Sequence, residues 1–135
     1  MLKRFIEQLS AEFKLEQTLA PNEDGSYSLP LEPNLNISLS ESPESGIRLY
    51  AVVCQLPQKN IENFLLQAMS ANLFGLETGS SSLGLDKEAK NLVLVNFIPE
   101  QLDYREFYEV LEDFVNYADA WSEEARVFFK QEAEQ

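Results

Sequence analysis

The spacing of the apolar residues switches between a helical and a strand period along the chain, which limits the folds open to it. Over residues 2–16, apolar side chains recur at steps of three and four, as on one face of a helix. From Tyr27 they alternate with polar residues, as in strands with one buried face. The predicted order is helix, three strands, helix, two strands, helix. This order indicates an α+β fold with helices packed on a mostly antiparallel, twisted sheet.

The first three strand-like segments differ in how much of their surface is apolar. Segments 27–31 and 35–39 each have one apolar face. Pro30 has no amide hydrogen to donate, so the first segment should be an edge strand or be irregular there. Segment 47–56 is apolar on both faces over its second half, which predicts a central strand covered on both sides.

Two later segments, 81–86 and 91–99, also read as strands, and the turn-like residues DKEAK between them predict a hairpin. Residues 92–95 are all apolar, so both faces of that strand should be buried or should contact another surface. The single cysteine, Cys54, is expected to be a small buried hydrophobic residue, because the chain has no histidine to activate a thiolate.

The segment after Pro57 has the pattern of a helix that is apolar over more than half of its circumference. Such a helix is either enclosed within the domain or buries its second face against another chain. Because 135 residues leave little material for a second covering layer, we favour a partner subunit. Gly75 is expected to end the helix. The residues expected in the dimer interface are Leu66, Met69, Leu73 and Phe74.

The last helix has a clear start signal. Asp103 is placed to cap it, Glu106 completes a capping box, and Leu102 can contact Phe107 across the first turn. The helix is expected to continue toward Lys130, with fraying of a polar tail over about 125–135. Its apolar stripe consists of Phe107, Leu111, Phe114, Ala118 and Trp121.

Charge excludes several classes of function. The chain has 23 acidic and 10 basic residues, a net charge of −13, and no histidine. Nucleic acids and anionic membranes bind Lys and Arg, so both are poor partners. Without histidine there is no Ser-His-Asp or Cys-His site, and one cysteine allows neither an internal disulfide nor a multi-thiolate zinc site. More than half of the net charge lies in residues 101–135, which is either a solvated helix face or a surface for a basic partner.

Carboxylates are the remaining candidates for chemistry. Glu109 and Asp113, one helical turn apart, could hold a hard cation or perform acid/base work. Such pairs are common on solvated helices, so we predict no catalytic, cofactor or metal site. The length predicts one domain over residues 1–135. The sequence has no run typical of a signal peptide or a membrane span, which predicts a soluble intracellular protein.

Four motifs follow one another over residues 72–121, and together they resemble the class I type III secretion chaperones, the Tir-chaperone-like family of small acidic bacterial proteins. The motifs are Asn72-Leu73-Phe74, Leu83-Gly84-Leu85-Asp86, Asn91-Leu92-Val93-Leu94, and a last helix that starts at Leu102-Asp103 and carries Phe107, Leu111, Phe114 and Trp121. The hairpin turn departs from the family, because this chain has Lys87-Glu88-Ala89-Lys90 where members often have a glycine.

The resemblance implies a homodimer in the bacterial cytoplasm that binds the N-terminal chaperone-binding segment of one or more secreted effectors. The segment would be held in an extended form, kept soluble and made competent for delivery to components of the secretion apparatus. The resemblance implies no cofactor and no enzymatic activity. In the family, the second helix and the neighbouring strand form much of the dimer interface.

An extended client can be held by apolar grooves or by strand addition at a sheet edge. The candidate client-binding residues are Phe5, Leu9, Phe13, Leu35, Ile37 and Leu39. The helical stripe among them is also compatible with a purely core role. Two other functions stay open: a dimeric scaffold or regulatory binding protein of the same fold, and a carboxylate-dependent enzyme.

Overall fold

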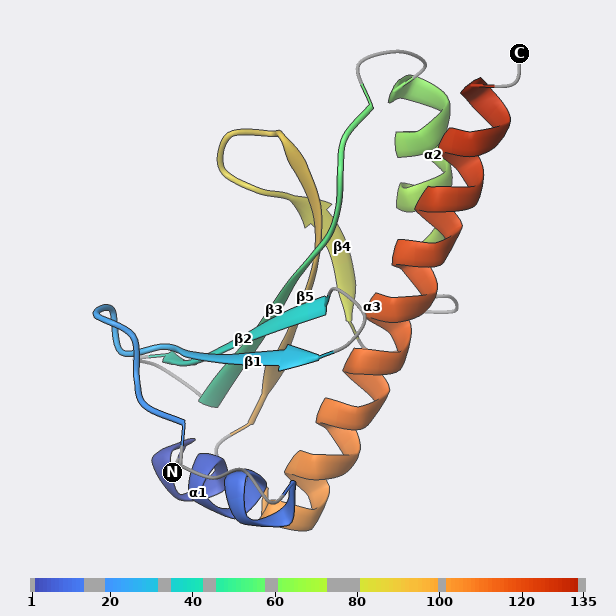
Figure 1. The fold of residues 1–135 in the computed structure, drawn as a ribbon. Coiled ribbons are helices and arrows are strands. Elements are labelled where there is room, and N and C mark those ends of the chain that lie inside the picture. The colour runs from blue at the N-terminus through green and yellow to red at the C-terminus, as the bar shows by residue number, and fades with distance from the viewer. Residues whose placement is uncertain are drawn as a thin grey trace.

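The computed structural model describes residues 2–13, 19–31, 35–42, 46–57, 61–72, 81–99 and 102–133. Its elements have the order predicted from the sequence, and the α+β class is confirmed (Figure 1). Residues 14–16, the predicted end of the first helix, lie outside the described residues. The elements are α1 (Leu2–Glu12), β1 (Tyr27–Leu31), β2 (Leu35–Ser42), β3 (Gly46–Gln55), α2 (Ile61–Ala71), β4 (Ser82–Leu85), β5 (Asn91–Ile98) and α3 (Tyr104–Ala133).

The five strands form one sheet in the order β1-β2-β3-β5-β4, with every neighbouring pair antiparallel. Pro30 lies in β1, which is an edge strand as predicted. The predicted hairpin of β4 and β5 is also present, with Leu83 opposite Leu94. The ladder of β3 and β5 is interrupted by a bulge between Val52 and Cys54. This arrangement leaves β1 and β4 as the two edges of the sheet.

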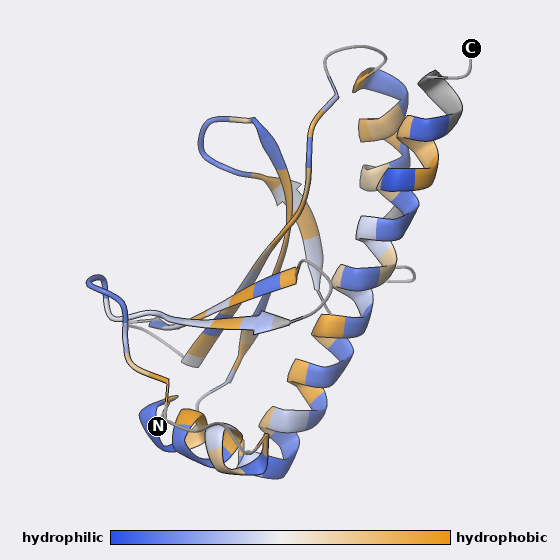
Figure 2. Ribbon diagram, viewed as in Figure 1, coloured by the Kyte–Doolittle hydropathy of each residue, from blue (hydrophilic) through white to orange (hydrophobic). Residues whose placement is uncertain are grey.

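The core lies between one face of the sheet and α3, which packs on that face against β2, β3 and β5 (Figure 1). Hydrophobic residues occupy the strands and the side of α3 turned toward them, while hydrophilic residues occupy the opposite side of the helix (Figure 2). At the bulge, the Ser122 hydroxyl donates to the carbonyl of Val53 at 3.0 Å. The largest fully buried side chains are Phe64, Phe107, Phe114, Ile6, Leu9, Ile37, Leu39, Ile47, Leu49, Leu92, Leu94 and Ile98.

Three corrections to the sequence-based predictions concern burial and helix length. Central β3 is covered on one face only in this chain, because Val52 on the other face is 45% exposed. Cys54 is half-buried, and its partial desolvation raises the pKa of its thiol to about 11. Residues 125–133, where a frayed tail was expected, are helical and continue α3, and Phe128 and Phe129 pack against Phe64 of α2 with ring centroids 5.2 and 5.1 Å away.

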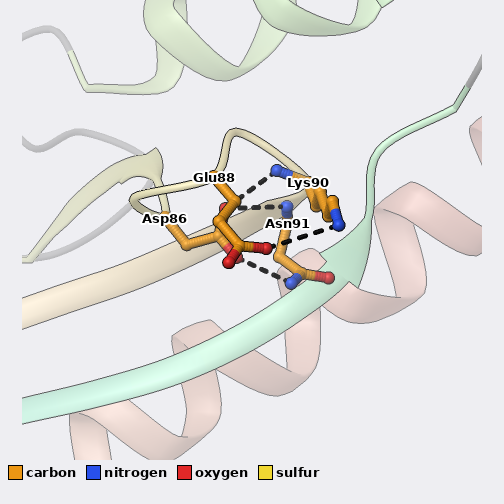
Figure 3. Close-up of polar contacts among 4 residues, drawn as sticks. All are labelled: Asp86, Glu88, Lys90 and Asn91. Atoms are coloured by element: carbon orange, nitrogen blue, oxygen red, sulfur yellow. Dashed lines mark hydrogen bonds and ion pairs between the residues drawn. The ribbon is translucent and has the colours of Figure 1, made fainter.

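The turn between β4 and β5 contains no glycine, and hydrogen bonds stabilise its backbone conformation instead. Ala89 has φ of 56°, in the left-handed region that favours glycine. The Asp86 carboxylate holds this turn by accepting from the amides of Lys90 and Asn91 at 2.8 and 3.2 Å (Figure 3). It also accepts from the Asn91 side chain at 2.7 Å, and this bond is the main cause of the lowered pKa of Asp86. A network of side-chain hydrogen bonds therefore supports a backbone shape that alanine rarely adopts.

Candidate functional site

A groove opens on the surface where the end of α1, edge strand β1 and the middle of α3 meet. It is a hollow of about 130 Å³ with mainly apolar walls. Phe13 forms one rim and is 43% exposed, with its ring 6.4 Å from that of Tyr108. The described residues that line the groove are Phe13, Leu29, Tyr108, Leu111, Glu112, Val115 and Asn116.

The position of Phe13 depends on how α1 is fixed to the rest of the fold. Phe5 stacks on Phe107 of α3 with centroids 4.7 Å apart. The Glu41 carboxylate accepts from the amide of Leu2 at 2.6 Å, which places a negative charge at the helix N-terminus, where the helix dipole stabilises it. At the other end, the Tyr104 hydroxyl donates to Glu12 at 2.6 Å. Contacts at both ends therefore hold Phe13 over the groove.

The structure separates the six candidate client-binding residues into two groups. Phe13 is on the surface, at the rim of the groove. The other five are buried in the core, which for the two helical residues, Phe5 and Leu9, is the alternative role that the sequence left open. These core residues are Phe5, Leu9, Leu35, Ile37 and Leu39. None of these five is among the residues that line the groove.

Several groove residues were not singled out from the sequence. Tyr108 and Val115 each lie one position after a buried phenylalanine of the α3 stripe, at Phe107 and Phe114. Together with Leu111 they repeat at steps of three and four, which is the signal that could have revealed a second stripe. Leu111 belongs to both stripes: it lines the groove with Tyr108 and Val115 and is also part of the buried core, as are the other members of the first stripe.

A second exposed apolar surface lies on α2, and we call it the α2 face. It consists of Leu66 and Met69, which are 65% and 70% exposed and lie three residues apart on the helix. The opposite side of α2 is buried through Phe64 and Ala68. Leu73 and Phe74, the other two residues expected in a dimer interface, lie outside the described residues, as does Gly75.

Asn72 connects the end of α2 to edge strand β4. Its side-chain amide donates to the carbonyl of Leu83 at 2.9 Å and accepts from the amide of Leu83 at 2.7 Å. Both backbone groups of Leu83 are therefore paired on this edge of the sheet. The two edges thus differ, because the backbone of β4 is blocked at Leu83, whereas β1 lies beside the open groove.

Acidic side chains dominate the solvent side of α3. Glu109 lies 3.8 Å from Arg105, and the Arg126 guanidinium beside Glu123 lowers the pKa of that carboxyl by hydrogen bonding. The described residues contain no group of three side chains able to hold a metal ion. None of the described helices is both long enough and apolar enough to cross a membrane.

The family model for the Tir chaperone proteins (CesT) matches residues 4–122. The chain belongs to the Tir chaperone protein (CesT) family. This confirms the resemblance found in the sequence, and the protein is a type III secretion chaperone of effector proteins. The family is a class of chaperones, which are binding proteins rather than enzymes.

Comparisons with individual proteins agree with this assignment. The chaperone is 33% identical over 122 residues to protein CPj0713/CpB0740 of Chlamydia pneumoniae, which covers 90% of this chain and 93% of the relative. Its fold is similar to that in the crystal structure of the ExsC–ExsE complex, with a TM-score of 0.74 at 20% identity, covering 90% and 91% of the two chains.

Two further solved structures share the fold. One is the HopA1–SchA chaperone–effector complex, with a TM-score of 0.69 at 20% identity, covering 90% of this chaperone and 93% of that chain. The other is the Yersinia pestis type III secretion chaperone SycH with a fragment of YscM2, with a TM-score of 0.67 at 18% identity, covering 90% and 99%. Similarity at this level of identity shows the fold of the chaperone.

Proposed function

We propose that the groove of α1, β1 and α3 binds an apolar side chain from the extended N-terminal segment of a secreted effector, in the bacterial cytoplasm. The observation that carries this proposal is an exposed apolar hollow directly beside an edge strand. An extended client can place alternate side chains in the hollow while its backbone pairs with β1. Pro30 supplies no amide donor, so pairing is weaker at that position.

The opposite edge of the sheet, β4, is less suited to strand addition, and this supports client binding at β1. At β4, a client strand would have to displace two hydrogen bonds between Asn72 and Leu83. Breaking them without full replacement leaves polar groups unpaired, which costs about 1–3 kcal/mol. Strand addition at β1 has no such cost among the described contacts. The bound segment stays soluble because its apolar side chains are covered, and it remains unfolded for delivery to the secretion apparatus.

The α2 face forms the contact between two copies of the chaperone in the proposed assembly. Leu66 and Met69 are large, apolar and mostly exposed, and exposed apolar side chains that adjoin on one face support a protein–protein contact there. Leu73 and Phe74 extend the same proposed contact. The acidic outer side of α3 keeps the resulting dimers apart by like-charge repulsion.

Catalysis by the carboxylates of α3 is not part of the proposal. Glu109 forms an ion pair with Arg105 and is exposed, as is Asp113. Neither carboxylate belongs to a described cavity with a second functional group. Their position is that of a solvated helix face.

The test is capture of the tagged full chain from the native organism, followed by mass spectrometry and limited proteolysis of the captured protein. The proposal predicts a stoichiometric secreted protein whose N-terminal region resists protease only in the complex. A monomeric chaperone that captures no secreted protein would contradict both parts of the proposal. A captured protein protected as a folded domain would contradict the extended mode of binding.

A further inference from the structure

We infer that the groove selects client segments in which a lysine or arginine lies two residues from the apolar anchor, and that Glu112 recognises this basic residue. The inference rests on the proposed client binding and adds a rule for which segments bind. Glu112 is the one charged residue among the described residues that line the groove. Asn116, one turn further along the helix, is the lining residue of α3 with an amide side chain.

The charge of Glu112 is available to a partner. Its side chain is exposed, and no ion pair or hydrogen bond joins it to another side chain among the described residues. Glu109, one turn earlier, differs because it already pairs with Arg105 at 3.8 Å. The groove rim therefore presents a carboxylate that a bound segment can pair with.

The spacing follows from the shape of an extended chain. Side chains in a strand alternate between two sides, so the residues next to the anchor point away from the groove. Residues two positions away lie on the same side as the anchor, about 7 Å along the strand. A lysine or arginine side chain at that position is long enough to reach the rim while its stem covers apolar surface.

The net charge of −13 attracts any basic segment, so the test must separate overall attraction from recognition by Glu112. The probes are labelled peptides of serine and threonine with one central phenylalanine and two lysines. In one peptide the lysines lie two residues from phenylalanine on each side, and in the other they are adjacent to it. The two peptides have equal composition and charge, so overall attraction is the same for both.

Binding of the full-length chaperone to both peptides is measured by fluorescence anisotropy. The peptide with spaced lysines should bind about two- to fivefold more tightly, the range expected for one exposed ion pair. The preference should disappear in Glu112→Gln and should shrink at high salt in the natural protein. Glu124→Gln, which changes the net charge equally on α3 away from the groove, should keep the preference.

The outcomes separate this inference from the proposed function. Equal binding of both peptides, with binding lost in Phe13→Ser, leaves client binding in the groove intact and overturns the recognition by Glu112. A preference that persists in Glu112→Gln also overturns it. If neither peptide binds, the groove is not a client site, and the inference that rests on it fails as well.

Discussion

The groove and the α2 face are both exposed and apolar, but they are built for partners of different shape. The groove is a hollow of about 130 Å³ whose walls come from three elements, with Glu112 and Asn116 at its edge. The α2 face is a convex strip on one helix, where Leu66 and Met69 project into solvent. A small hollow fits single side chains of an extended chain, whereas a convex strip fits the surface of a second folded body. The difference teaches that exposed apolar area alone does not define a binding function.

The largest expected effect comes from placing charge on the α2 face. The double change Leu66→Asp and Met69→Asp should weaken self-association by on the order of a hundredfold, because two carboxylates would be buried without partners. Sedimentation equilibrium measures this directly. Phe97→Asp is the matched control, since Phe97 is 59% exposed on the uncovered face of the sheet. A double variant that still forms dimers would contradict the assignment of this face.

The next effect should be confined to the groove. Phe13→Ser should weaken binding of a captured effector segment by about tenfold, because it removes an aromatic wall of the proposed pocket. Dimerisation should not change. Val52→Ser is a suitable control, because Val52 is 45% exposed and Phe13 is 43% exposed, yet Val52 lies away from the groove. Equal losses of segment binding in the two variants would show that the groove has no special role.

A smaller effect is expected where α2 joins the sheet. Asn72→Ala removes both hydrogen bonds to Leu83 and should lower the free energy of unfolding by about 1–3 kcal/mol. It should also weaken dimerisation, while groove binding stays unchanged. Chemical denaturation of this variant beside Asn36→Ala, an exposed asparagine on β2, provides the measurement. If Asn72→Ala lost segment binding without losing stability, the claim that the groove binds its client independently of the α2 face would be contradicted.

The smallest effect belongs to the hairpin turn, which is part of neither surface. Hydrogen bonds, chiefly from Asn91, lower the folded-state pKa of Asp86, so its contribution to stability is present near neutral pH and is lost as pH falls through that pKa. The difference in unfolding free energy between natural protein and Asp86→Asn should therefore shrink from about pH 6 to about pH 3. A difference that does not depend on pH would show that the charge of Asp86 is unimportant for the turn.

Local rules in the sequence were sufficient for the elements of the fold. Pro30 indicated an edge strand or a local irregularity, because its missing amide hydrogen cannot serve a central ladder, and β1 is an edge strand. Asp103 identified the start of α3, where its carboxylate accepts from the amide of Glu106 at 2.8 Å. Both features depend on neighbouring residues alone.

The exposure of individual side chains could not be predicted in the same way. Phe5 and Phe13 belong to one helical stripe, but α3 covers Phe5 and leaves Phe13 at the rim of the groove. The sequence of β3 places the apolar residue Val52 on the second face of the strand, but it does not tell whether another element covers that face, and Val52 is exposed. These outcomes depend on where distant elements pack, and that information is absent from the spacing of residues within one segment.

Site-specific photo-crosslinking most directly tests whether the two surfaces bind different partners. A photoreactive amino acid is placed at Phe13 in one full-length variant and at Leu66 in another, and both are activated in the native organism. The position of Phe13 should crosslink to a secreted effector, within its N-terminal segment, and the position of Leu66 should crosslink to a second copy of the chaperone. Crosslinks to the same partner from both positions would contradict the division of function between the groove and the α2 face.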